Sequence, residues 1–224
     1  MDRKNFIGVL LVTIVVLLIA LSIPGRQHEE TRTDLPWVIT PTETGSITVF
    51  GLTLGESTLK QAETKFQEPA EVSLFERKKD KNRVIEAYFN RTLLSSINAQ
   101  VVVVMDVTKN DLDAFYKGGA RIAKMGDGGR KVTLNGADLE RLYQMPIHSM
   151  TYIPKAKLNE LLLVQRFGEP QQKIEEQEIG VSHWLYPDKG LDIILNKSGK
   201  AVFQYLPPRD FDKLIKPLQS LKSK

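Results

Sequence analysis

The chain has 224 residues and no cysteine, and its 31 basic and 27 acidic residues give a net charge of +4. Without cysteine, disulfides, thiolate metal sites, cysteine nucleophiles and lipid-modified cysteines are excluded. The basic excess is mild and spread along the chain, whereas nucleic-acid-binding domains concentrate it in a patch, so we predict no nucleic-acid partner.

Residues 6–23 form one unbroken apolar run without a charged residue. About 18 such residues suffice to cross a bilayer core as a helix, so this segment is the predicted membrane anchor. Arg3 and Lys4 precede it in residues 1–5, and the positive-inside tendency places that short terminus in the cytoplasm. We therefore expect a single-pass protein of a bacterial inner membrane, with its C-terminal part in the periplasm.

A cleaved signal peptide is the alternative interpretation of the same segment. Ala20-Leu21-Ser22 supplies the small residues that a cleavage site requires. The apolar run is longer than most signal-peptide cores, which favours a retained anchor. Cleavage after Ser22 would instead release a secreted inhibitor or adaptor.

Proline, glycine and charged residues dominate the next segment, which is typical of a stalk. Beyond the stalk we expect an α+β module, a glycine-rich linker with a short helix, a second α+β module, and a C-terminal helix or tail. The predicted bounds of the stalk and these four parts are 24–46, 47–117, 118–146, 147–208 and 209–224.

In the first predicted module, a short strand over 46–50 precedes a helix that Ser57 caps and that ends at Phe66. Strands over 71–76 and 84–89 follow, joined by a basic turn. The strand predicted over 97–107 contains four consecutive valines, and we expect it to be largely buried. A short helix over 110–116 ends this module.

In the second predicted module, a strand over 147–153 leads into a helix over 155–167. Four short strands separated by turn residues follow, over 173–178, 182–186, 191–195 and 201–206. The fold class predicted from this order is α+β: after the transmembrane helix come two small modules, each a helix packed on an antiparallel meander.

Two short motifs recur at the ends of the main helices: Phe66-Gln67-Glu68-Pro69 and Phe167-Gly168-Glu169-Pro170. With Trp184-Leu185-Tyr186 in the later meander, this pattern resembles the BamE (SmpA/OmlA) family and the modules of β-lactamase inhibitor proteins. The resemblance implies small α+β domains that bind other envelope proteins without catalysis. The chain departs from that family in lacking the lipidated cysteine, and in having Gln67 where the family has glycine.

A second set of motifs suggests an enzyme instead. Ser57-Thr58-Leu59-Lys60, Ser96-Ile97-Asn98 and Lys197-Ser198-Gly199 match in order the signatures of penicillin-binding proteins. The third motif lies in a predicted turn rather than on a strand, and the folded part is short for that fold. We therefore predict no enzyme, and keep an envelope enzyme that uses Ser57 and Lys60 as the alternative.

The three histidines, His28, His148 and His183, are isolated and lack the spacing of metal ligands. We predict no metal, no cofactor and no small-molecule substrate. The predicted partners are envelope proteins, together with the lipid bilayer through residues 6–23.

Four aromatic residues of the last meander are the candidates for a partner-binding surface, because tyrosine and tryptophan anchor interfaces well. They are Trp184, Tyr186, Phe203 and Tyr205. Within each pair the residues are two positions apart and so share one face of the sheet. The alternative is that this face packs in the core.

Overall fold

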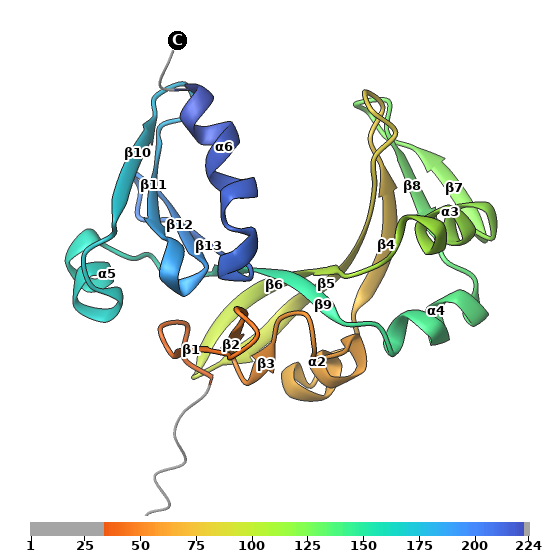
Figure 1. Ribbon diagram of the computed structural model, residues 1–224, viewed down its shortest axis with the longest axis horizontal. Coiled ribbons are helices and arrows are strands. Elements are labelled where there is room, and N and C mark those ends of the chain that lie inside the picture. Colours follow the sequence, from red (N-terminus) through yellow and green to blue (C-terminus); the bar gives the residue numbers. More distant parts are fainter. Residues whose placement is uncertain (1–33, 222–224) are drawn as a thin grey trace, which may run out of the picture. The chain divides into compact units, whose positions relative to one another are not determined.

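One continuous antiparallel sheet of ten strands dominates the computed structural model, which describes residues 34–221 (Figure 1). Its strand order is β10-β11-β12-β13-β9-β6-β5-β4-β8-β7. The strands are β4 (Glu71–Glu76), β5 (Arg83–Leu94), β6 (Ile97–Met105), β7 (Arg121–Lys124), β8 (Arg130–Thr133), β9 (Ile147–Pro154), β10 (Gln172–Glu176), β11 (Val181–Tyr186), β12 (Leu191–Asn196) and β13 (Ala201–Tyr205).

The predicted fold class, two modules with separate meanders, is wrong, because the strands form one continuous sheet. Strand β9 pairs with β6 on one side and with β13 on the other, so the two predicted sheets are fused. The predicted linker over 118–146 is not a linker, because it supplies β7 and β8 at one edge of the sheet. One contact unit accordingly contains all the described residues.

The predicted transmembrane helix over 6–23 lies outside the described residues. Within residues 34–221, no helix is both long enough and apolar enough to cross a bilayer.

The two faces of the sheet differ in how they are covered. Along β6, Val101 and Val103 are fully buried while Val102 and Val104 are only half-buried. Pairing extends this alternation to both neighbours: Val101 lies opposite Phe89 and Tyr152, and Val102 lies opposite Tyr88 and Thr151. We call the side of Val101 the covered face and the side of Val102 the open face.

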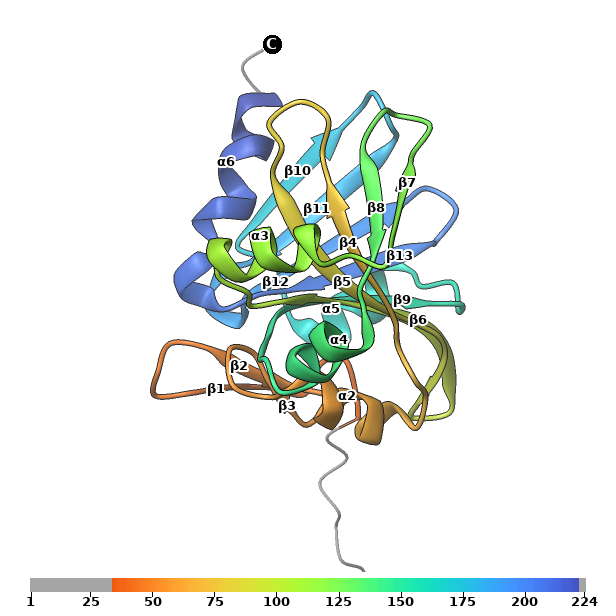
Figure 2. The ribbon, with the colours of Figure 1, turned by 90° about the vertical axis from the view of Figure 1, so that its right-hand side faces the viewer.

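Four helices and a small second sheet pack on the covered face. The helices are α2 (Leu59–Phe66), α3 (Lys109–Lys117), α4 (Gly136–Tyr143) and α5 (Glu160–Phe167), and the three strands are β1 (Ile39–Pro41), β2 (Ile47–Val49) and β3 (Leu52–Thr53). Each of these helices contributes buried residues to the main core. Figures 1 and 2 both show α2, α4 and the small sheet on the same side of β5, β6 and β9.

Residues 34–46, expected to be stalk, belong in part to this layer. The Tyr205 hydroxyl donates to the Pro36 carbonyl at 2.9 Å, and the Ser95 amide donates to Asp34 at 2.9 Å. Trp37 packs edge-on against Phe167, with ring centroids 6.4 Å apart. The described chain is therefore tied to the domain from its first residues.

On the open face, one helix covers one end of the sheet. Helix α6 (Asp212–Leu221) follows the short helix η2 (Pro208–Asp210), whereas η1 (Pro187–Lys189) connects β11 and β12. A small second core forms beneath α6, in which Ile174, Leu185 and Phe211 are buried. Strands β4, β5, β6 and β9 remain outside this helix's cover (Figure 1).

The two recurring motifs occupy equivalent helix ends with different backbone geometry. Gln67, at the C-cap of α2, has φ +54° and ψ +34°, a left-handed conformation that costs a non-glycine residue roughly 1–2 kcal/mol. Gly168, at the C-cap of α5, has φ +80° and ψ −179°, a region that is essentially restricted to glycine. The helix N-cap of α2 is Thr58 rather than the predicted Ser57.

These cap conformations predict opposite effects for reciprocal substitutions. Gln67→Gly should raise the free energy of unfolding by roughly 0.5–1 kcal/mol, because it removes the left-handed strain at the cost of a more flexible unfolded chain. Gly168→Gln should lower it by about 1–3 kcal/mol. Urea unfolding of both variants checks the pair; destabilisation by Gln67→Gly would mean that the Gln67 side chain itself stabilises the helix end.

Candidate functional site

The four aromatic residues proposed as a partner surface lie in the core. Trp184, Tyr186, Phe203 and Tyr205 are all at most 3% exposed. Burial raises the pKa of Tyr186 to about 12 and that of Tyr205 well above its ordinary value. Their location corresponds to the core-packing alternative, and they offer no surface to a partner.

These four side chains lie on the covered face, where they pack against other rings and polar groups. The Phe203 ring lies 5.5 Å from Tyr152 and 5.6 Å from Phe167, centroid to centroid. The Trp184 indole donates to Ser182 at 3.1 Å, and the Lys173 ammonium lies 3.6 Å from the centre of its ring. Tyr186 and Phe203 thus pack against Phe167 of α5, while Tyr205 contacts Pro36 of the N-terminal segment.

The residues of the penicillin-binding-protein motifs are not assembled into a site. The Ser57 hydroxyl accepts from the Thr53 amide at 2.9 Å, which fixes the loop before α2. Lys60 lies exposed on α2, and Lys197 lies in the β12–β13 turn. Among the described residues, no hydrogen bond or ion pair joins Ser57 to either lysine.

Within the described range, no group of three or more histidine or acidic side chains is arranged so that it could hold a metal ion. His28 lies outside that range. His183, however, belongs to a polar cluster beneath α6 that the sequence did not reveal: its Nδ1 lies 2.7 Å from Asp192 and its Nε2 lies 3.3 Å from Glu176.

Asp192 is fully buried, and its Oδ1 has no hydrogen-bond partner in the described structure. Burial raises the pKa of Asp192, although His183 opposes this effect. Burial would lower the pKa of His183, but the hydrogen bonds and negative charges of Asp192 and Glu176 outweigh burial and raise it. The cluster of His183, Asp192 and Glu176 contains no nucleophile, so we assign it a structural role.

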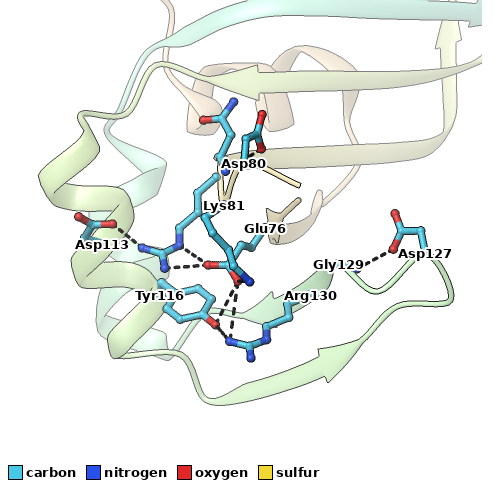
Figure 3. Close-up of polar contacts among 10 residues, drawn as sticks. Glu76, Asp80, Lys81, Asp113, Tyr116, Asp127, Gly129 and Arg130 are labelled. Atoms are coloured by element: carbon cyan, nitrogen blue, oxygen red, sulfur yellow. Dashed lines mark hydrogen bonds and ion pairs between the residues drawn. The ribbon is translucent and has the colours of Figure 1, made fainter. Parts of the chain in front are cut away.

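A second charged cluster joins two hairpins at the other end of the sheet (Figure 3). Glu76, at the end of β4, is 4% exposed and accepts from the Arg83 guanidinium at 3.0 and 2.7 Å. Lys81 and Arg130 lie 3.9 and 3.8 Å from the same carboxylate. Arg83 also pairs with Asp113 on α3.

This network holds the β4–β5 hairpin, β8 and α3 together, so its charges serve the fold. The sequence indicated that the basic residues are spread evenly, whereas the structure gathers several of them at this end of the sheet. The exposed ends of both hairpins carry basic side chains: Arg77, Lys78, Lys79, Lys81, Lys124 and Arg130.

The open face is the remaining candidate for a binding surface. Its centre carries apolar side chains on β6, Val102 and Val104, flanked by Tyr88 of β5 and by Thr151 and Ile153 of β9. All are half-buried, although these strands lie in the middle of a ten-stranded sheet. Valine suits a face that another surface covers.

A signal for this face was present in the sequence. The four consecutive valines predicted a largely buried strand. In the structure, Val101 and Val103 are fully buried, whereas Val102 and Val104 are half-buried. The valines make β6 apolar on both faces, although helices and the small sheet cover only one of them. The apolar side chains on the other face indicate that this face is suited to contact with another molecule.

Comparison with protein-family models, curated proteins and solved structures yields no match.

Proposed function

We propose that this protein is a non-enzymatic, membrane-anchored scaffold or adaptor of the bacterial envelope, which binds an envelope protein through the open face of its sheet. One observation supports this above the others: at the centre of the sheet, apolar side chains on one face are only half-buried, while those on the other face are fully buried. Interfaces bury such patches, and a sheet face supplies the area that a stable complex needs.

The location in this proposal rests on the sequence. The apolar run over 6–23, with basic residues before it, supports an inner-membrane anchor and a periplasmic domain. The secreted form cleaved after Ser22 would bind its partner through the same face. The N-terminal sequence of the mature protein distinguishes the two.

Site-specific photo-crosslinking in cells tests the binding face. A benzoylphenylalanine at Thr151, on the open face, should give an adduct of defined mass. The same group at Glu140, exposed on α4 of the covered side, should not. Equal adducts from both positions, or none from either, would contradict the proposal.

The enzyme alternative has its own test. Covalent labelling by a fluorescent penicillin that is lost on Ser57→Ala would replace the binding function with a catalytic one. We expect no labelling, because no lysine is brought to the Ser57 hydroxyl within the described part of the chain.

A further inference from the structure

A hollow of about 280 Å³ lies in the open face, where β4, β5 and β6 run side by side. Two carboxylates, two aromatic rings and a valine line it: Glu71, Glu86, Phe75, Tyr88 and Val102. The register explains their convergence, because Glu71 lies opposite Tyr88, and Tyr88 lies opposite Val102.

Glu86 is the unusual member of this set. Its side chain is half-buried on β5, yet it forms no hydrogen bond or ion pair with any described residue. The residues directly opposite it, Ser73 on β4 and Val104 on β6, carry no positive charge. Burial accordingly raises the pKa of Glu86, with no attraction from a cation to oppose it.

The other charged groups near the hollow leave this carboxylate uncompensated. Glu71 lies on β4 on the same face and adds a second negative charge. Lys131 of β8 also lines the hollow, but its ammonium is placed towards the Phe75 ring, 5.8 Å from the centroid. The two carboxylates outnumber the one ammonium, so the hollow carries a negative excess.

These contacts select the kind of group that fits. An apolar side chain seated here would seal Glu86 from water without a partner, which is costly, and an anion would be repelled. A cation gains the charge-assisted hydrogen bond and lies against aromatic rings. Arginine fits better than lysine, because its planar guanidinium stacks on rings while it donates to a carboxylate.

We propose that this hollow receives an arginine side chain of the protein bound at the open face, with Glu86 accepting hydrogen bonds from the guanidinium and Phe75 and Tyr88 flanking it. The inference rests on the proposed function and deepens it, because it names the chemistry by which the partner is recognised. The occupant is a partner protein rather than a second copy of this chain.

Methyl NMR of the full chain in detergent tests this with two short peptides, acetyl-Gly-Arg-Gly-amide and the same peptide with citrulline. Citrulline keeps the shape of arginine but lacks its charge. The arginine peptide should shift the Val102 methyl resonances saturably, and the citrulline peptide should bind at least about tenfold more weakly. Glu86→Gln should weaken arginine-peptide binding by a similar factor, while Glu140→Gln on α4 should leave it unchanged.

Equal binding of the two peptides, or equal binding by the wild type and Glu86→Gln, would overturn the arginine site. Self-association of the chain that is lost on Glu86→Gln would also overturn it, by assigning the hollow to a second copy. These outcomes are separable from failure of the proposed function. If Thr151 gives an adduct but the chain shows no preference for the arginine peptide, the proposed binding face is supported and the arginine site is wrong. If the chain prefers the arginine peptide but Thr151 gives no adduct in cells, the scaffold function is wrong and the hollow still binds arginine.

Discussion

Replacing Phe203 by alanine should lower the free energy of unfolding by about 3–5 kcal/mol. The ring is 1% exposed and lies against Tyr152, Phe167 and Tyr205, so its removal leaves a cavity that these large rings fill poorly. Urea unfolding followed by tryptophan fluorescence measures the change.

Leu161→Ala is the matched control for this cavity. Leu161 lies on α5 but is 78% exposed, so its truncation should change stability by no more than about 0.5 kcal/mol. If Phe203→Ala left stability unchanged while abolishing the crosslinked adduct, Phe203 would be an interface residue after all.

Removing His183 alone should cost about 3–5 kcal/mol, because His183→Ala leaves the fully buried Asp192 without its partner. The double variant His183→Leu/Asp192→Leu should be much closer to the wild type, since it removes both polar groups and fills the space beneath α6 with apolar side chains. A double variant as unstable as His183→Ala would mean that the pair stabilises the fold by its own attraction.

The same pair predicts a pH dependence. The pKa of His183 is raised above its ordinary value of 6.5, so the folded protein holds this proton more tightly than the unfolded chain does. The resulting stabilisation is complete below about pH 6.5 and is lost as the pH rises through the raised pKa. Unfolding of the wild type at a series of pH values above 6.5 should show this loss, and His183→Gln, which does not titrate, should not.

The sequence predicted local structure well where one short-range signal decides it. The helix ending at Phe66 and the four strands after Pro170 lie within a few residues of their predicted bounds, because caps, prolines and turns act locally. The separation into two modules was wrong, because the glycine-rich character of 118–146 indicated a linker. In the structure, β8 of this segment pairs with β4, more than fifty residues earlier in the chain, and β7 pairs with β8.

The sequence also did not identify the open face as the candidate binding surface, because the choice of face depends on long-range packing. Two-residue alternation shows that Trp184 and Tyr186 share a face, but not which face is covered. That choice depends on α5 and the segment around Trp37 packing on one side, which is a long-range event. Glu86 carried no sequence signal, since its lack of a partner is a property of Ser73 and Val104 on neighbouring strands.

The hydrogen bond between Tyr205 and Pro36 constrains the order in which the parts of this domain can fold. The two residues are 169 positions apart, so the first described segment cannot complete its contacts until β13 has joined the sheet. Phe50, whose ring lies 5.1 Å from Tyr152 and 5.8 Å from Tyr205, must wait for the same event. The first described residues are thus among the last to dock, and a chain halted before residue 205 should leave Phe50 exposed to chaperones.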